Sequence, residues 1–344
     1  MSSILIISEY DEGVPLAFAL RSEGHIVRTL SKHCPEIFNE GANPARITRP
    51  TQMLEQFDLL LSTTTQIDPE LEKSKRLIGA GRFHTKLLDP VYMDSIRMSL
   101  LLETSPTPLN GQKMLVTAWM SSNGFCPFHL ITLTYDRLME GERGPLFYAG
   151  STHKLIAQSK LFDFVFLPLL PLLLKVNFIG PLTACLHLTS SMCYVNWLSP
   201  LPLPFILQGL KELYRPSLFS LLWELLSNGG KEREEVKSNE CSLCVSLSCS
   251  PPRADECFLN PPPEALPHLW LRDAKETPEG FLTMGTSGLL GCISARGVTI
   301  KECKRRVQRT LSNAIKSPEV QYRSDIGDNA EQRFSEIRGW GWMI

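Results

Sequence analysis

The stretch Phe281–Gly327, FLTMGTSGLLGCISARGVTIKECKRRVQRTLSNAIKSPEVQYRSDIG, decides the fold that the sequence predicts. Its first half contains two short apolar runs, Phe281–Met284 and Leu289–Ser294. A glycine-marked turn separates the two runs, and this pattern is typical of a β-hairpin. Thr299 then precedes Glu302 by three residues, which is the spacing of a capping box and predicts that a helix begins there.

The predicted helix has an apolar face and a basic face. Its apolar residues recur at helical spacing and should be buried: Ile300, Cys303, Val307, Leu311 and Ile315. Its basic residues form a stripe on the opposite face: Lys301, Lys304, Arg305, Arg306 and Arg309. No aromatic residues accompany the stripe and the net charge of the chain is −1. A solvated helix face is therefore the preferred interpretation, phosphate or nucleic-acid binding is the alternative, and we expect no nucleic-acid partner.

A third strand, Val320–Tyr322, should follow the helix, and the sequence YRSDIG closes the segment. This order of hairpin, helix and closing sequence resembles the C-terminal domain of the phosphoribosylamine–glycine ligase (glycinamide ribonucleotide synthetase) family, which are ATP-grasp enzymes of purine biosynthesis. The resemblance implies that Arg323 and Asp325 bind substrate or nucleotide. An ion pair that closes the third strand is the alternative, and the sequence leaves both open.

The N-terminal region reads as a βαβ unit. Ile4–Ile7 is a short buried strand, and Val14–Ser22 is a helix that Gly24 should end. The strands His25–Leu30 and Phe57–Leu61 follow. This alternation predicts a parallel sheet covered by helices.

The turn after the first strand, Ser8–Gly13, reads SEYDEG. In the resembling family this turn is rich in glycine and contacts the substrate phosphate, so the resemblance implies that Gly13 binds substrate. Here Glu9, Asp11 and Glu12 place carboxylates where an anion would lie. Because like charges repel, a polar and solvated turn is the simpler interpretation.

A second resemblance lies in the middle of the chain, at Leu138–Gly150, LMEGERGPLFYAG. It is similar to the family's conserved substrate loop, which implies substrate or nucleotide contacts for four residues: Glu142, Arg143, Gly144 and Pro145. The family loop continues with small polar residues, whereas this chain continues with Leu146–Tyr148. The family also carries a nucleotide-covering lobe before this point, and here the connection Thr104–Gly111 to the strand Met114–Met120 is too short for a lobe.

The magnesium-binding position of the family differs as well. Aligning the strand around Tyr194 puts Trp197 where the family has its metal-binding glutamate and Leu201 where it has an arginine. Magnesium requires hard oxygen ligands, which an indole and a leucine lack. Between Phe164 and Gly209 the chain contains no Asp or Glu. ATP and magnesium are thus implied by the resemblance only, and we expect no metal site in this wall.

Four cysteines invite comparison with a zinc site: Cys241, Cys244, Cys249 and Cys257. Their spacing lacks the paired two-residue knuckles of zinc ribbons. In residues 241–249 the odd positions are apolar residues or cysteine, and the even positions are mostly serine. This alternation predicts a half-buried strand, and a metal site is the alternative. The histidines show no spacing typical of a metal site or a catalytic triad, and His129 and His268 are expected to be structural or surface groups.

The apolar middle of the chain does not predict a membrane span. The run Phe164–Leu174 is shorter than the roughly 20 residues that a transmembrane helix needs, and it contains Pro168 and Pro171. Ten cysteines are too few for a disulfide scaffold, and no signal peptide is recognised. We therefore expect a cytoplasmic protein without a membrane contact.

Together these observations predict a mixed α/β and α+β chain. Residues 1–103 should form a βαβ domain of the pre-ATP-grasp type, and residues 104–230 a shortened ATP-grasp-like domain. Residues 231–344, which begin with the charge run Lys231–Asn239, should form a hairpin-and-helix domain like that of glycinamide ribonucleotide synthetase.

The resemblance implies an ATP-dependent ligase that joins glycine to the amine of phosphoribosylamine. Because the covering lobe, the metal glutamate and the glycine-rich loop are not found, we expect weak or lost catalysis, as in a pseudoenzyme, and no catalytic residue is identified. The alternative is a non-catalytic structural or interaction protein that forms homo- or hetero-oligomers through the apolar middle, Phe162–Phe205. A truncated or divergent gene product is a third hypothesis.

Overall fold

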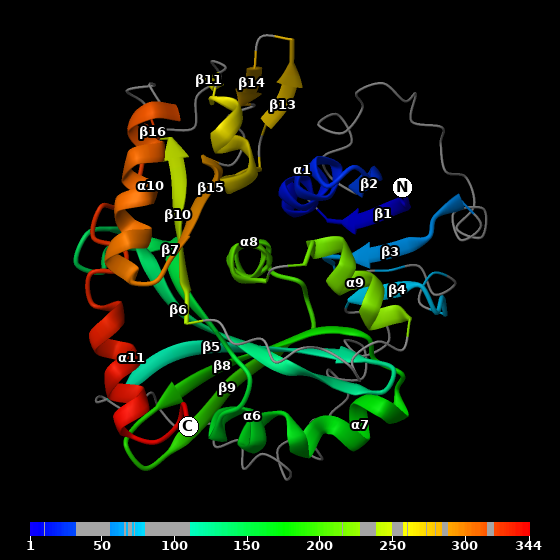
Figure 1. Ribbon diagram of the computed structural model, residues 1–344, viewed down its shortest axis with the longest axis vertical. Helices are drawn as coiled ribbons and strands as arrows, with labels where there is room; N and C mark the ends of the chain where they lie inside the picture. Colours follow the sequence, from blue (N-terminus) through cyan, green and yellow to red (C-terminus); the bar gives the residue numbers. More distant parts are fainter. Residues whose placement is uncertain are drawn as a thin grey trace.

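The computed structural model arranges its elements around one central helix, α8 (Pro204–Leu213), which is seen end-on in Figure 1. The large sheet lies on one side of α8 and the N-terminal sheet on the other. The structure describes residues 1–9, 11–31, 56–64, 67, 71, 73–79, 111–214, 216–227, 239–249, 257–259, 261–272, 274–278, 280–283, 288–314 and 320–344. The predicted connection Thr104–Gly111 and the charge run Lys231–Asn239 lie outside these residues except at Gly111 and Asn239.

The N-terminal sheet is parallel and has the strand order β2-β1-β3-β4. Its elements are β1 Ser3–Ser8, α1 Val14–Ser22, β2 Ile26–Ser31, β3 Leu59–Ser62 and β4 Leu77–Gly79. Gly24 has a φ of +89°, a conformation that favours glycine, and ends α1 as expected. The predicted βαβ arrangement is confirmed.

The large sheet joins strands from the middle of the chain to strands from its C-terminal part. Its order is β12-β15-β10-β7-β6-β5-β8-β9, and β16 adds to the edge of β10. The strands are β5 Gln112–Ser121, β6 Gly124–Met139, β7 Arg143–Ile156, β8 Gly180–Leu188, β9 Cys193–Ser199, β10 Cys241–Cys249, β12 Leu269–Leu271, β15 Leu289–Gly297 and β16 Val320–Gln321. One sheet therefore crosses the expected boundary at residue 231, and the boundary itself stays a prediction.

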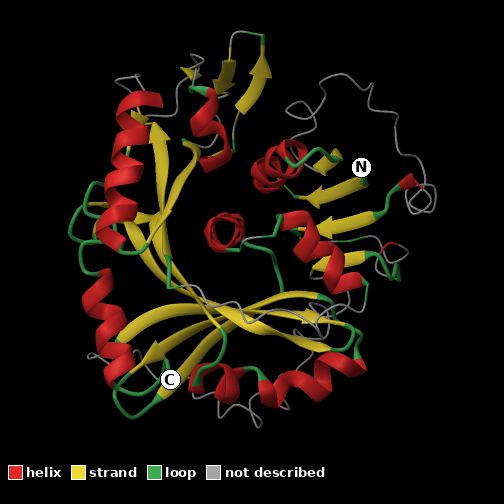
Figure 2. Ribbon diagram, in the orientation of Figure 1, coloured by secondary structure: helices red, strands yellow, loops and turns green. Residues whose placement is uncertain are grey.

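Helices cover both faces of the large sheet (Figure 2). α6 (Lys160–Val165) and α7 (Leu170–Lys175) lie on one face, and α8 and α9 (Leu218–Leu226) lie between the sheet and the N-terminal strands. α10 (Ile300–Ala314) and α11 (Ala330–Gly339) lie on the side away from α8. The remaining short elements are η1 Asp11–Gly13, η2 Leu167–Leu169, η3 Pro263–His268, β11 Cys257–Leu259, β13 Ala274–Thr277 and β14 Gly280–Thr283. Within the described ranges, no helix combines the length and the apolarity that a membrane crossing requires.

The predicted hairpin between Phe281–Met284 and Leu289–Ser294 is wrong, although both strands exist. β14 pairs with β11 and β13 in a three-stranded sheet, whereas β15 pairs with β10 and β12 in the large sheet. A period of two and a glycine-marked turn identify strands, but they do not identify the partner of each strand.

The predicted loop conformation of Leu138–Gly150 is wrong, because most of the segment is strand, and its contact with substrate stays a prediction. β6 continues to Met139 and β7 begins at Arg143, so only a tight turn separates them. The residues that replace the small polar run of the family loop, Leu146–Tyr148, include two aromatics, which favour strands. α8 ends at Leu213 and α9 begins at Leu218, and Pro216 lies between them.

Strand β10 has the predicted bounds but is buried on both faces instead of one. Its odd-numbered residues belong to the same core cluster as Cys303, Val307 and Leu311 of α10. On the other face, Ser242 Oγ donates a hydrogen bond to the backbone O of Gly209 in α8 at 3.0 Å. The serines pair with partners inside the protein, so they are buried without the cost of an unsatisfied hydroxyl.

The N-terminal sheet is fastened to α9 by the side chain of Glu23. Its carboxylate oxygens accept hydrogen bonds from the N–H groups of Leu218 and Phe219, each at 3.0 Å. These amides open α9 and have no partner within the helix, and the negative charge also suits the positive end of the helix dipole. His25 stacks on Phe219 with ring centroids 3.9 Å apart. The carboxylate therefore caps a helix whose first residue, Leu218, lies 195 residues after Glu23 in the chain.

We expect the Glu23→Gln substitution to lower the free energy of unfolding by about 1 kcal/mol, because one charged cap of two amides becomes a neutral one. Urea unfolding followed by far-UV circular dichroism measures the change. Glu264→Gln, at an exposed carboxylate in η3, is the matched control and should leave the unfolding midpoint in place. Equal midpoints for Glu23→Gln and the wild-type chain would contradict the role of the cap.

Candidate functional site

The β6–β7 turn meets the C-terminal sequence YRSDIG, which brings together three residues predicted for the site. Arg323, only 4% exposed, connects them. Its Nη1 donates hydrogen bonds to Glu142 Oε1 at 2.7 Å and to the backbone O of Arg137 at 2.8 Å. Its Nε and Nη2 each donate to the carboxylate of Asp325 at 2.8 Å. The guanidinium is thus engaged by two carboxylates and one carbonyl.

The same cluster fixes the conformation of the β6–β7 turn. Asp325 Oδ2 accepts a hydrogen bond from the N–H of Gly141 at 2.9 Å. Glu142 has a φ of +54°, which is uncommon for a residue other than glycine. Ser324 Oγ donates a hydrogen bond to Glu140 Oε1 in the same turn. The ion pair with Arg323 therefore holds a turn whose backbone is not at its lowest energy.

The electrostatics of the cluster favour mutual pairing over anion binding. Burial alone would raise the pKa of Asp325, but the Arg323 guanidinium and the Gly141 N–H outweigh burial and hold that pKa below its usual range. Burial also opposes the charge of Arg323, yet its hydrogen bonds to Asp325 and Glu142 raise the pKa of the guanidinium. An anion would have to displace Asp325 or Glu142 from the guanidinium before it could bind there. These contacts support the ion pair that closes the third strand, and a substrate contact of the same residues stays a prediction.

A pocket of about 570 Å³ lies beside this cluster. Its lining comes from the end of β6, β7, β10 and the segment around β16: Leu138, Met139, Glu140, Arg143, Phe147, Ala149, Ser246, Ser248, Val320, Gln321, Tyr322 and Arg323. Arg143, exposed at the start of β7, donates from Nε to the backbone O of Glu140 at 3.1 Å. Gly144 and Pro145 follow it as exposed strand residues. Of the predicted group, Arg143 and Arg323 line the pocket.

Gly13 lies apart from the other predicted residues, because α1 and the β6–β7 turn are on opposite sides of α8 (Figure 1). It precedes α1, and a Cβ at this position would come within 2.9 Å of Ile6 Cγ2 and 3.1 Å of Ser8 Oγ. In the same turn, Glu12 Oε1 accepts hydrogen bonds from the N–H of Glu9 at 2.8 Å and from Thr63 Oγ1 at 3.4 Å. A carboxylate of the chain itself therefore binds an amide of this turn.

Trp197 lies on β9 opposite Cys185 of β8, and its side chain is 43% exposed. Its neighbour Asn196 donates from Nδ2 to Cys185 Sγ at 3.9 Å. No group of three or more His, Cys, Asp or Glu side chains within the described segments is arranged to hold a metal ion. The wall formed by β8 and β9 thus contains no carboxylate where the predicted alignment expects its metal ligand.

Comparison with solved structures identifies the fold. The phosphoribosylamine–glycine ligase of Thermotoga maritima superposes with a TM-score of 0.72 at 15% identity, over 94% of this chain and 100% of that one. The phosphoribosylglycinamide synthetase of Anaerococcus prevotii gives a TM-score of 0.57 at 10% identity, over 91% and 98% of the two chains. The pyruvate carboxylase of Rhizobium etli gives 0.62 at 12% identity, over 97% of this chain and 36% of that one.

The chain has an ATP-grasp fold. The resemblance inferred from the C-terminal sequence is confirmed at the level of the fold. No protein-family model and no curated protein matches the chain by sequence.

The ATP-grasp fold implies a nucleotide with magnesium, and the described residues do not fit that group. β8 and β9 contain neither Asp nor Glu, so they supply no anionic oxygen to a divalent ion. The indole of Trp197 stands at the position that the alignment gives to the metal-binding glutamate.

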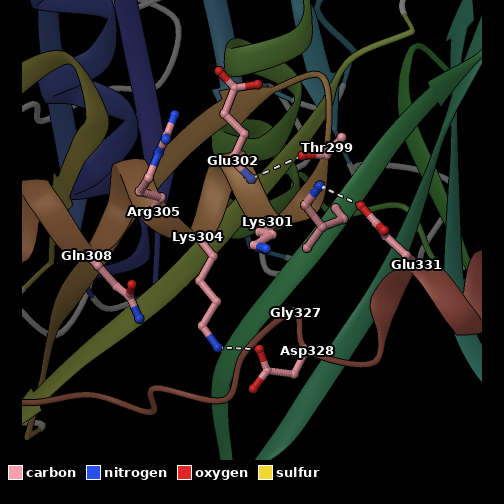
Figure 3. Close-up of a pocket in the computed structure, with 10 residues that line it drawn as sticks. Thr299, Lys301, Glu302, Lys304, Arg305, Gln308, Gly327, Asp328 and Glu331 are labelled. Carbon is pink, nitrogen blue, oxygen red and sulfur yellow. Dashed lines mark hydrogen bonds and ion pairs between the residues drawn. The ribbon is translucent and has the colours of Figure 1, made fainter.

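A second pocket, of about 820 Å³, was not predicted from the sequence. It lies between the first turns of α10 and the start of α11, and Figure 3 shows one ion pair among its charged side chains, between Lys304 and Asp328. Lys304 Nζ donates to Asp328 Oδ1, and Glu331 Oε1 accepts from the N–H of Ile300 at 3.2 Å. The basic stripe of α10 forms one wall of this pocket. Helical periodicity predicts that these residues share one face of the helix, but it does not predict which segment lies opposite that face.

The predicted helix start at Thr299 is confirmed, with one difference in the capping box. Thr299 Oγ1 accepts from the N–H of Glu302 at 3.2 Å, as expected. The carboxylate of Glu302 accepts from the N–H of Val298 at 3.0 Å, instead of from that of Thr299. This hydrogen bond is the main reason that the pKa of Glu302 lies below its usual range.

A buried polar cluster around Glu212 was also missed. Glu212 Oε1 accepts hydrogen bonds from Ser294 Oγ at 2.6 Å and from His268 Nδ1 at 2.7 Å. The three residues come from α8, β15 and η3, which are far apart in the sequence, so no local spacing of residues predicts the cluster. Ser294 Oγ also donates to the backbone O of His268 at 3.2 Å, but it does not bind the imidazole. Because the imidazole binds the carboxylate and not the hydroxyl, the cluster is not a nucleophile–base pair.

We expect Arg323→Lys to lower the free energy of unfolding by about 1–3 kcal/mol, since an ammonium cannot reproduce the two-pronged bond to Asp325 and the bond to Glu142 together. Thermal and urea unfolding measure the loss. Arg309→Lys, on the exposed face of α10, keeps the same chemistry and should be neutral. If the two variants unfold alike, the cluster does not close the third strand.

Proposed function

We propose that this chain is an ATP-grasp protein similar to phosphoribosylamine–glycine ligase whose own ligase activity is weak or lost. The observation that carries the proposal is that β8 and β9 contain no acidic residue. The alignment expected from the sequence puts Trp197 at the family's magnesium-binding glutamate. Coordination of magnesium by hard oxygens is the part of the chemistry that other residue types cannot replace.

In the resembling family, a carboxylate such as that of glycine is activated by ATP and captured by the amine of phosphoribosylamine. Such phosphoryl transfer depends on positioning and on cationic stabilisation of the developing charge. In this chain the guanidinium of Arg323 is already paired with Asp325 and Glu142. It is therefore not available to stabilise a transferring phosphoryl group.

The turn after β1, Ser8–Gly13, supports the proposal as well. Glu12 binds the N–H of Glu9, and its carboxylate would have to be displaced before a sugar phosphate could use that amide. Displacement costs the hydrogen bond and brings two anions together. Binding of phosphoribosylamine at this turn would therefore be weak.

The second candidate function is a structural or interaction protein built on the same scaffold, and one surface favours it. Three large apolar side chains are exposed along α6, η2 and α7: Phe164 at 37%, Leu167 at 45% and Leu174 at 41%. They lie in the apolar middle that the sequence singled out. A face of this kind suits self-association through a second copy of the chain.

Calorimetry with Mg–ATP tests the proposal directly. We expect no saturable heat at millimolar nucleotide, and no ADP release above a protein-free blank when glycine and phosphoribosylamine are added. The Thermotoga maritima ligase serves as the positive control in the same buffer. A matched variant, Trp197→Glu with Leu201→Arg, restores the residue types of the family and should bind Mg–ATP more tightly than the wild-type chain.

Two outcomes would contradict the proposal: sub-millimolar binding of Mg–ATP by the wild-type chain, or glycine-dependent ADP release. Light scattering on the same sample addresses the second candidate. A mass that rises with protein concentration would support self-association, and a constant monomer mass would count against it.

A further inference from the structure

Two buried thiols face each other between β10 and α10. Cys241 is the first residue of β10, and Cys303 lies in the first turns of α10. Their sulfur atoms are 3.6 Å apart, although 62 residues separate them in the chain. A disulfide requires about 2.05 Å between the sulfurs, so closure needs a shift of the order of 1.5 Å shared by a strand end and a helix end.

The hydrogen bonds around the pair already orient both sulfurs. Cys241 Sγ lies 3.3 Å from the backbone O of Gly297, and Cys303 Sγ lies 3.2 Å from the backbone O of Cys241. Gly297 is followed by Val298, which is 67% exposed. The pair is therefore buried but lies close beneath the surface turn that joins β15 to α10.

The two thiols differ in acidity. The hydrogen bond with Cys303 lowers the pKa of the Cys241 thiol, and the ammonium of Lys154, opposite it on β7, adds to this effect. The same hydrogen bond and burial raise the pKa of Cys303. Because the thiolate is the nucleophilic form, Cys241 is the sulfur that reacts first.

We propose that Cys241 and Cys303 are a redox-responsive pair that closes to a disulfide when the chain meets hydrogen peroxide. This role is independent of nucleotide binding. The Cys241 thiolate attacks one peroxide oxygen, the O–O bond breaks, and hydroxide leaves and takes up a proton to form water. Cys241 is now a sulfenic acid; the sulfur of Cys303 attacks it, the S–O bond breaks, and a second water leaves with the proton of Cys303. Two thiols are oxidised and one peroxide is reduced to two waters.

Closure would tie α10 covalently to β10 beside the pocket in Figure 3. The residues on either side of Cys303, Glu302 and Lys304, line that pocket. A cross-link between elements far apart in sequence also restricts the unfolded chain. The oxidised protein should therefore melt at a higher temperature than the reduced protein and keep its first α10 turns fixed.

Other thiols in the described part of the chain are poorer candidates. Burial raises the pKa of Cys193 to about 12, which leaves almost no thiolate at neutral pH. Cys244 lies on the face of β10 opposite to Cys241 and interacts with Cys292 of β15. Burial raises the pKa of Cys244 well above its usual value. The Cys244–Cys292 pair is thus the competitor that an experiment must separate.

Peptide mapping of the full chain after peroxide treatment tests the proposal. The fully reduced protein is exposed to a small excess of hydrogen peroxide, alkylated, and digested without reductant. We expect one cross-linked peptide pair that joins Cys241 to Cys303, with a mass lower by two hydrogens, and a loss of two titratable thiols. Cys241→Ser should protect Cys303 from oxidation, whereas Cys303→Ser should leave a sulfenic acid at Cys241 that dimedone traps. Cys193→Ser is the control and should behave as the wild-type chain does.

Three results would overturn the proposal. One is a cross-link between Cys244 and Cys292 in place of the expected pair. Another is equal thiol loss in the wild-type chain and in Cys241→Ser. The third is dimedone labelling spread over several cysteines in Cys303→Ser. Far-UV circular dichroism of each variant before oxidation confirms that the comparison is made between folded proteins.

Discussion

The structure depends on strand β10, which must be buried on both of its faces. One face packs against α10 through the cluster that contains Leu243, Val245 and Leu247, and the other meets α8 through the bond from Ser242 to Gly209. Burial of one such aliphatic side chain contributes roughly 1.5–3 kcal/mol. Because β10 lies between β7 and β15, this strand connects the middle of the chain to its C-terminal part.

None of this packing requires the residues that bind magnesium and nucleotide in an ATP-grasp enzyme. The apolar cores around β10 and α8 form without an acidic residue in β8 or β9, and the Arg323 cluster closes its strand with partners from the chain itself. A fold can therefore keep its architecture while its site changes, since the two draw on different residues. The chain can therefore combine an ATP-grasp fold with strands β8 and β9 that contain neither Asp nor Glu.

Much of the fold was predictable because it rests on local signals. The helix Val14–Ser22 and the strand Cys241–Cys249 have the predicted bounds, and Thr299 caps α10 as its spacing indicated. Strand partners were not predictable, so β14 and β15 were joined into a hairpin although they belong to different sheets. At the site, the family resemblance identified Glu142 and Arg323 as candidates, but it could not predict that the two side chains form an ion pair with each other.

The wall of β8 and β9 should offer no anionic ligand to a divalent ion bound to ATP, because neither strand contains Asp or Glu. The most direct measurement is the water-proton relaxation rate of Mn²⁺–ATP, a paramagnetic substitute for Mg²⁺–ATP, during titration with the chain. The account predicts that the relaxation rate stays at the value of Mn²⁺–ATP in buffer, because the complex continues to tumble freely. A saturable enhancement of the relaxation rate that excess Mg²⁺–ATP reverses would contradict it.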